Sequence, residues 1–251
     1  MACVSETDLR GVSLVLVSHG SRGRNRAGEM GRTLADEIAR GGWFRRVVHR
    51  TWTDGIRPLS AEAAEWADDS PVFVLPCLID HGVLCDQLFP ARLELAAERT
   101  FPVVYGLPLG RHRGVGGMLW RQALSQAAAP WRQSLVLVGH GSSRGMGGAV
   151  DAMADRMRGH GVFADVRAAY VEGVPSLTRW SELVGGDEVL LMPVFLEGGN
   201  HVRDLPALAR QGGGRDRPFR LLRWIPEPNR LARLVVGMAR AAMVRPKGGV
   251  S

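Results

Sequence analysis

The sequence predicts an α/β protein of two similar lobes, each a parallel four-stranded sheet flanked by helices, related by internal duplication. The first observation is a repeated segment: residues 14–23 read LVLVSHGSRG and residues 135–145 read LVLVGHGSSRG. A self-match of this kind indicates a duplicated structural unit. The second observation is that apolar strand-like runs alternate with helical patterns in both halves, which is typical of a parallel sheet covered on both faces. At 251 residues, the chain is long enough for two lobes with cores of their own.

The first half alternates the two kinds of segment four times. Strands are expected at residues 12–17, 46–53, 71–78 and 101–107. Helices are expected over 27–40, from 58 onward, over 90–99 and over 114–128. The segments 20–26 and 82–88 are expected to be loops.

The second half repeats this order of segments. Strands are expected at residues 134–138, 162–170, 188–195 and 219–225. Helices are expected over 149–158, 175–183, 205–210 and 229–243. A join near Pro130 divides the chain into an N-terminal lobe, residues 1–130, and a C-terminal lobe, residues 131–251.

The charge balance favours a small anionic ligand. The net charge is +7, and Lys247 is the only lysine among 32 basic residues, so the other 31 are arginine. Arginine pairs well with carboxylates and phosphates, although a GC-rich genome would also enrich it. The arginines are scattered and form no basic run with interleaved aromatics, so nucleic acid is not the expected partner.

The bulk composition indicates a soluble protein of the cytoplasm. Hydrophobic residues make up 45% of the chain and charged residues 23%, and no apolar run is long enough to span a membrane. The N-terminal residues lack a secretory pattern, so a cytoplasmic location is expected. The three cysteines form no Cys-x-x-Cys pair, which argues against a disulfide framework or a thiolate cluster, and Cys77 is expected in the core.

Ligand-type residues follow the first three strands of the second half. They are His140, Glu172 and His201. Because the carboxyl ends of parallel strands meet at one edge of a sheet, we expect these side chains to lie together. Two imidazoles and a carboxylate suit a divalent ion such as Co²⁺, Fe²⁺, Ni²⁺ or Zn²⁺, and imidazole also accepts protons near neutral pH. A single glycine-flanked histidine can simply cap a turn, but three such residues at one edge favour a functional site.

The corresponding residues of the first half are less complete. Aligning the halves places His19, Asp54 and Leu84 opposite the three residues above. Leucine can neither bind a metal nor move a proton, so the first half is expected to carry a degenerate copy of the site. His81 lies three residues before Leu84 and can replace it only if this loop folds differently.

These motifs resemble the class II tetrapyrrole chelatases, specifically the sirohydrochlorin chelatase group that includes CbiX, CbiK and SirB. The matching segments are residues 140–144 (HGSSR), 172–175 (EGVP), 193–201 (PVFLEGGNH) and 204–206 (DLP). The resemblance covers nearly the whole chain, including its two halves. CbiK-like members carry their histidines in the C-terminal lobe, whereas long CbiX and SirB members usually carry them in the N-terminal lobe. Leu84 departs from the latter pattern.

The resemblance implies insertion of Co²⁺ or Fe²⁺, with Ni²⁺ as an alternative, into sirohydrochlorin during cobalamin or siroheme biosynthesis. It implies that His140, Glu172 and His201 bind the metal and act in catalysis, and that no cofactor is needed beyond the substrate metal. The residues expected to contact the anionic tetrapyrrole are Ser142, Arg144, Arg203, His19 and Arg22.

The alternatives to a chelatase are two other classes of function. One is a non-catalytic metal or tetrapyrrole carrier built on a chelatase fold, because a fold does not fix a function. The other, a nucleotide-binding domain, is disfavoured because neither a phosphate-binding nor a dinucleotide-binding glycine motif follows a strand. The sequence leaves open whether the protein is a homodimer.

Overall fold

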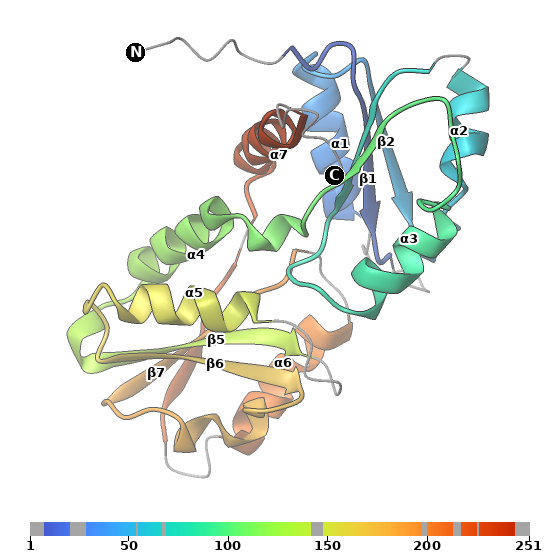
Figure 1. The fold of residues 1–251 in the computed structure, drawn as a ribbon. Coiled ribbons are helices and arrows are strands. Elements are labelled where there is room, and N and C mark those ends of the chain that lie inside the picture. The colour runs from blue at the N-terminus through green and yellow to red at the C-terminus, as the bar shows by residue number, and fades with distance from the viewer. Residues whose placement is uncertain are drawn as a thin grey trace, which may run out of the picture.

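The protein contains two parallel β-sheets of four strands each, set in one chain with helices around them (Figure 1). The strand orders are β2-β1-β3-β4 in the first sheet and β6-β5-β7-β8 in the second, so the two sheets have the same topology. The computed structural model describes the chain apart from residues 1–7, 21–28, 54, 67–68, 142–147, 197–199, 213–216, 225 and 244–251, and apart from the side chains of 200–202.

The first sheet and the segments after it occupy the N-terminal half. Its strands are β1 (Ser13–Ser18), β2 (Arg46–Thr51), β3 (Val72–Pro76) and β4 (Val103–Tyr105). Its α-helices are α1 (Glu29–Arg40), α2 (Leu59–Trp66), α3 (Phe89–Arg92) and α4 (Arg113–Gln126). A π-helical turn, η1 (Leu84–Leu88), precedes α3, and the short 3₁₀ segments are η2 (Leu109–Arg111) and η3 (Pro130–Arg132).

The second half repeats the arrangement. Its strands are β5 (Gln133–Gly141), β6 (Asp165–Glu172), β7 (Glu188–Pro193) and β8 (Phe219–Leu221). Its helices are α5 (Ala149–Arg158), the 3₁₀ segment η4 (Leu177–Glu182), α6 (Asn200–Gly212) and α7 (Pro228–Met243). The predicted fold class, two similar lobes with four parallel strands each, is therefore confirmed.

Several element boundaries differ from the prediction. The segment 82–88, expected to be a loop, contains the π-helical turn Leu84–Leu88. The helix expected over 90–99 is reduced to Phe89–Arg92, and the one expected over 175–183 is 3₁₀ with a non-helical residue at Arg179. In contrast, the helix expected over 205–210 begins earlier, at Asn200.

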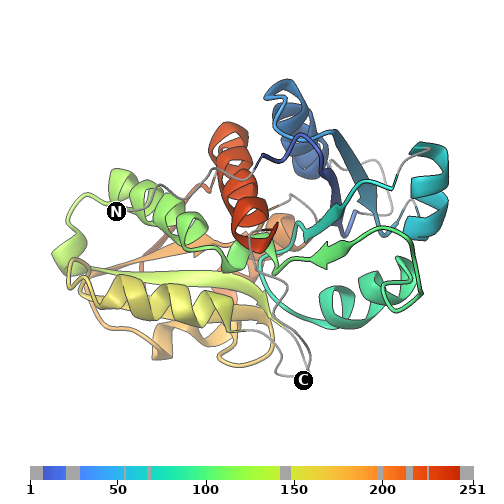
Figure 2. The same cartoon turned by 45° about the horizontal axis from the view of Figure 1, so that its top comes forward.

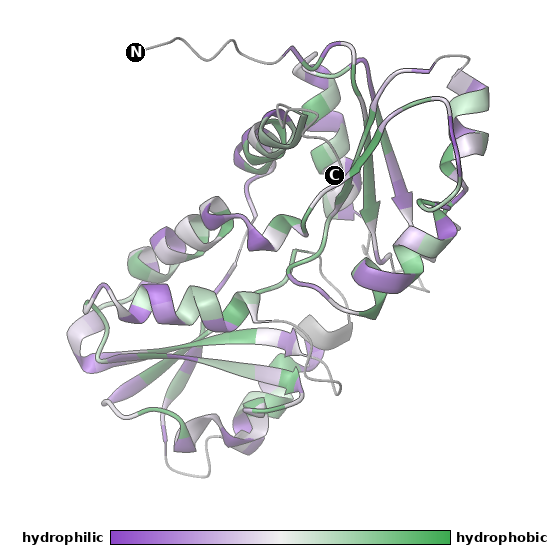
Figure 3. Ribbon diagram, viewed as in Figure 1, coloured by the Kyte–Doolittle hydropathy of each residue, from purple (hydrophilic) through white to green (hydrophobic). Residues whose placement is uncertain are grey.

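The alternation of side chains along the two central strands explains their continuous apolar runs. In β1, Leu14 and Leu16 face one core cluster while Val15 and Val17 face another, so both sides of the sheet are covered. In β5 the residues 135 and 137 join the same cluster as Leu14, and residues 136 and 138 face a third. Figure 3 shows β1 and β5 as hydrophobic segments within this arrangement. One core therefore runs between the two sheets and belongs to both lobes.

Two helices cross between the lobes. Helix α4 follows the first sheet but packs on the second lobe. There the ring of Trp120 packs edge-to-face on that of Phe163, with the ring centroids 5.6 Å apart. Helix α7 follows the second sheet but lies along α1 of the first, as Figures 1 and 2 both show. The division at residue 130 stays a prediction, because this exchange ties each sheet to a helix from the other half.

The structure bears on the expectations for Cys77 and for membrane-spanning segments. Cys77 is 5% exposed and lies in the shared core, as predicted. Among the described residues, none of the helices has both the length and the apolar character that crossing a membrane requires.

Candidate functional site

Both histidines of the repeated His-Gly segment lie at the carboxyl edge of a sheet. His19 follows β1, and His140 is the penultimate residue of β5; both are exposed. Each ring contacts the next residue's carbonyl through Nδ1, at 2.6 Å for His19 and 3.2 Å for His140. The strand end therefore fixes the position of each imidazole while leaving it open to solvent.

The glycine after each histidine is required by its backbone. Gly20 has φ +71° and Gly141 has φ +80°, a region that other residues rarely adopt. There is also no space for a side chain, because a Cβ on Gly141 would lie 1.8 Å from the carbonyl oxygen of Glu172. The equivalent Cβ on Gly20 would lie 2.1 Å from Thr53 Oγ1. The repeated glycine is explained by this close approach of the neighbouring strand.

The same close approach puts Glu172 beside Gly141, the residue after His140. Gly141 and Glu172 are paired in the register of β5 and β6, so His140 and Glu172 end adjacent strands at one edge. Glu172 is exposed there, at the last residue of β6. The strand ends that carry His140 and Glu172 are therefore neighbours in the second lobe, and the approach of the imidazole to the carboxylate stays a prediction.

His201 lies in the first turn of α6, the helix that follows β7. Strand β7 pairs with β5 on the side opposite β6, so α6 starts from the same edge of the sheet. Trp180 holds this helix in place, since its indole N–H donates to the Ala209 carbonyl at 2.7 Å and its ring is fully buried. The His201 side chain lies outside the described part of the structure, and so its approach to His140 stays a prediction.

The expected substrate-binding residues are only partly described. Ser142, Arg144 and Arg22 fall outside the described residues, as does Asp54, the counterpart of Glu172. Arg203 is exposed on α6, with its Nε 4.0 Å from the Asp204 carboxylate.

The first lobe differs at the position opposite His201. Leu84 begins the π-helical turn and packs against the cluster that covers the outer face of the first sheet. An apolar, half-buried side chain serves packing at this place, and the degenerate first site stays a prediction.

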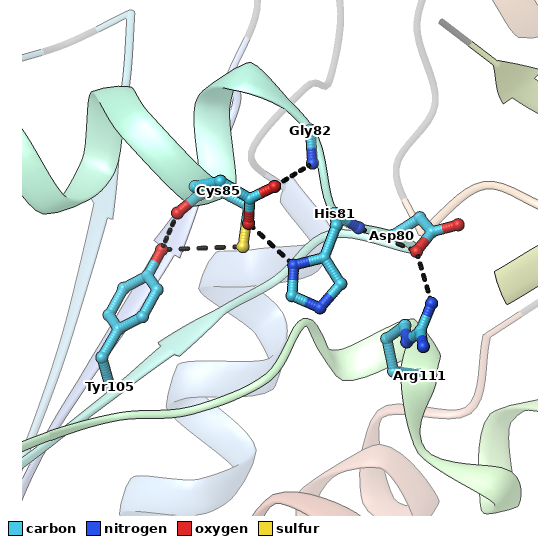
Figure 4. Close-up of polar contacts among 7 residues, drawn as sticks. Asp80, His81, Gly82, Cys85, Tyr105 and Arg111 are labelled. Atoms are coloured by element: carbon cyan, nitrogen blue, oxygen red, sulfur yellow. Dashed lines mark hydrogen bonds and ion pairs between the residues drawn. The ribbon is translucent and has the colours of Figure 1, made fainter. Parts of the chain in front are cut away.

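This turn and the residues just before it bring together donors that were not grouped from the sequence. His81, Cys85 and Asp86 offer ligand atoms within 4.8 Å of one another (Figure 4). Cys85 is buried, and Tyr105 donates to its carbonyl at 2.7 Å. Burial raises the pKa of the Cys85 thiol to about 11, so the free thiol stays protonated at neutral pH. The π-helical winding could not be read from the sequence, although the close spacing of His81, Cys85 and Asp86 was a visible signal.

The chain's two tyrosines give a direct test of these buried surroundings. Burial is the largest cause raising the pKa of both Tyr105 and Tyr170, and a hydrogen bond to Asp151 adds to it for Tyr170. We therefore expect neither phenol to ionise when the pH of the native protein passes about 10, the ordinary value for tyrosine. The stability that these groups contribute is complete below this pH and is lost as the pH rises further. Ultraviolet titration of tyrosinate absorbance measures this, with the urea-unfolded chain as the control; a native midpoint near 10 would contradict it.

Asp80 links the carboxyl edges of the two lobes. It follows β3, and its carboxylate accepts the backbone N–H of Ala149, the first residue of α5 in the second lobe, at 2.5 Å. Arg111 Nη1 and the His81 N–H donate to the other oxygen, at 3.2 Å and 2.8 Å (Figure 4). An acidic group at a helix N-terminus satisfies a free N–H and complements the helix dipole. The contact sets the start of α5 against the loop that carries His81.

We expect Asp80→Ala to lower the free energy of unfolding by about 1 to 2 kcal/mol, the cost of losing a helix cap. The Asp80 side chain is 17% exposed, so water replaces its contacts poorly. Asp187→Ala is the matched control, because Asp187 also pairs with an arginine, Arg132, but is 63% exposed and is expected to change stability by less than about 0.5 kcal/mol. Urea unfolding of both variants makes the comparison, and equal losses would show that the interlobe contact contributes nothing.

Comparison with known proteins shows that both halves of the chain match the same family model. The CbiX family model matches residues 13–126 and again residues 134–235. A probable sirohydrochlorin cobaltochelatase of Halobacterium salinarum is 25% identical over 221 residues, which cover 77% of this chain and 75% of that protein.

Solved structures share the fold at lower identity. SirB from Bacillus subtilis with Fe³⁺ has a TM-score of 0.72 at 16% identity, covering 94% of this chain and 97% of that one. A multi-domain Deinococcus radiodurans protein with structural similarity to chelatases has a TM-score of 0.70 at 22% identity. The match covers 95% of this chain but 56% of that longer protein, which has two additional domains.

Proposed function

Because the chain belongs to the CbiX family, we propose that it is a chelatase that inserts a divalent metal ion into sirohydrochlorin. The family model covers both halves, and the Halobacterium salinarum relative is named as a probable sirohydrochlorin cobaltochelatase. Co²⁺ and Fe²⁺ are the proposed metals, and the ion is a substrate of the reaction. Ni²⁺ suits the same ligand types, so availability would influence which ion is used.

One observation carries the assignment of the site to the second lobe. His140 lies near the end of β5, Glu172 ends the adjacent strand β6, and His201 begins the helix that follows β7 on the other side of β5, so this shared edge supports the assignment. We assign metal binding and catalysis to these three residues. The matching edge of the first lobe has Leu84 in place of the second histidine.

Metal insertion into a macrocycle requires groups that both bind a metal and accept protons. A free-base macrocycle loses two protons as the metal enters its ring. Neutral imidazoles at His140 and His201 can hold the ion, release it to the ring and take up a proton, and Glu172 can serve as a further ligand or base. Both His140 and Glu172 are exposed, so the macrocycle can reach them from solvent.

The carboxylates of the macrocycle need cationic partners. We assign this role to Arg22, Arg144 and Arg203, with Ser142 and His19 as additional contacts. The overall charge of +7 supports the assignment, since a positive protein attracts an anionic substrate. The proposed setting is the cytoplasm, and a homodimer stays a prediction.

The test is a direct assay of metal insertion. Purified protein is mixed with sirohydrochlorin and Co²⁺ or Fe²⁺, and the visible absorption bands of the macrocycle are followed over time. A rate well above the spontaneous reaction supports the enzyme. Tight binding of the macrocycle or the ion without any acceleration would reject it and identify a carrier instead.

A further inference from the structure

The π-helical turn of the first lobe gathers three side chains that bind metals in proteins. These are the imidazole of His81, the thiol of Cys85 and the carboxylate of Asp86 (Figure 4). His81 Nδ1 lies 2.7 Å from Asp86 Oδ1, and every ligand atom of the set is within 4.8 Å of the others. His81 and Asp86 are about one-third exposed, whereas Cys85 is buried, so the cluster opens to solvent on one side.

The backbone holds the acidic donor in place before any ion arrives. The Gly82 N–H donates to Asp86 Oδ2 at 3.1 Å, while Asp86 Oδ1 faces His81. The His81 N–H donates to Asp80, the residue that caps α5 of the second lobe. π-Helical turns are uncommon and are often found at functional sites, which fits a turn that brings together a cysteine and its neighbouring aspartate.

The separation of the donors is close to what a metal site requires. Around an ion with ligand bonds of about 2.0 to 2.3 Å, tetrahedral donors lie roughly 3.3 to 3.7 Å apart. The distance between His81 Nδ1 and Asp86 Oδ1 would increase by about half an ångström, and the longest donor–donor distance would decrease by about one ångström. Side-chain rotation supplies changes of this size. The Cys85 thiol would release its proton to solvent as the sulfur became a ligand. Three protein ligands leave a fourth position for water.

The donor set does not come from the duplicated site. With the offset of 117 residues that aligns Leu84 with His201, His81, Cys85 and Asp86 correspond to Gly198, Val202 and Arg203. None of these three can match the chemistry of its counterpart. The first half thus has its own set of donors at the edge where Leu84 stands in place of a counterpart to His201.

We infer that the first lobe carries a separate site for a borderline divalent cation, such as Co²⁺ or Zn²⁺, formed by His81, Cys85 and Asp86. A sulfur, an imidazole nitrogen and a carboxylate oxygen together suit these ions better than Mg²⁺ or Ca²⁺, which prefer oxygen ligands. The site is distinct from the residues assigned to the second lobe and goes beyond the proposed function.

Cobalt spectroscopy tests this inference without any measurement of activity. The full chain with His140→Ala and His201→Ala, which lacks two of the residues assigned to the second-lobe site, is titrated with Co²⁺ under reducing conditions. We expect one bound ion per chain with a thiolate-to-cobalt charge-transfer band in the near ultraviolet. Since the second-lobe set contains no sulfur, this band reports the first-lobe site alone, whatever the outcome of the chelatase assay.

The variants define the ligands. Cys85→Ser should abolish the band, whereas Cys77→Ser and Cys3→Ser, which remove the other two thiols, should retain it. Asp86→Asn and His81→Asn should each weaken Co²⁺ binding by at least about tenfold. These two partly exposed residues keep the test decisive if Cys85→Ser impairs folding. A missing thiolate band at saturating Co²⁺, a band that survives Cys85→Ser, or unchanged affinity in both other variants would overturn the inference.

Discussion

His201→Ala is expected to lower the rate of metal insertion into sirohydrochlorin by roughly 10² to 10⁴-fold, the usual contribution of one positioned acid–base residue. The variant loses an imidazole that we assign both to holding the ion and to accepting a proton from the macrocycle. His140→Ala is expected to have an effect of the same order, because His140 lies near the end of β5, His201 follows the adjacent strand β7, and both are assigned to one ion. Initial rates with Co²⁺ or Fe²⁺ at fixed sirohydrochlorin measure both variants.

The first-lobe histidines are the matched controls. His19 occupies the same place in the first His-Gly segment that His140 occupies in the second, but its lobe has Leu84 where the second histidine is needed. His19→Ala and His81→Ala should therefore reduce the rate by no more than a few-fold. The double variant His140→Ala/His201→Ala should be about as slow as the slower single variant, because residues that act as a unit are not additive. If His19→Ala proves the most damaging change, the active site belongs to the first lobe.

The duplication and the sheets were predictable because strands and turns depend on local sequence. The apolar runs of β1 and β5 and the glycines at positions 20 and 141 carry their structural reason within a few residues: two covered faces, and a positive φ beside a neighbouring strand. That β5 and β6, the strands carrying His140 and Glu172, end at the same edge then follows from parallel topology alone. For this reason, internal comparison of the two halves located an edge of the sheet correctly.

The features that could not be predicted depend on contacts between distant segments. The exchange of α4 and α7 is set by packing such as Trp120 against Phe163, and no local pattern encodes which lobe a helix will cover. The contact of Asp80 with the start of α5 joins residues 69 positions apart. The winding of residues 84–88 as a π-helix changes which side chains meet, so the cluster of His81 with Cys85 and Asp86 was hidden within an expected loop.

Gly141→Ala is expected to damage stability and activity together. Alanine in a left-handed conformation costs about 1 to 2 kcal/mol, and the contact of its Cβ with the Glu172 carbonyl adds to that cost. For a chain of this size, the melting temperature should fall by roughly 4 °C or more. Relief of the contact requires β5 and β6 to separate at their carboxyl ends, which moves His140 away from Glu172. Thermal unfolding and the chelation rate measure the two effects.

Variants of two other glycines are controls that distinguish a loss of stability from damage to the proposed active site. Gly237 lies exposed on α7 with open space around it, so Gly237→Ala should raise stability by up to about 1 kcal/mol through helix propensity. Gly20→Ala repeats the strain of Gly141→Ala, with φ +71° and the side chain of Thr53 in the way, but in the first lobe. We expect it to lower the melting temperature to a similar extent while retaining most of the chelation rate measured well below that temperature. Equal loss of rate in Gly20→Ala and Gly141→Ala would mean that both sheet edges serve the reaction, and would reject the asymmetry between the two copies of the His-Gly segment.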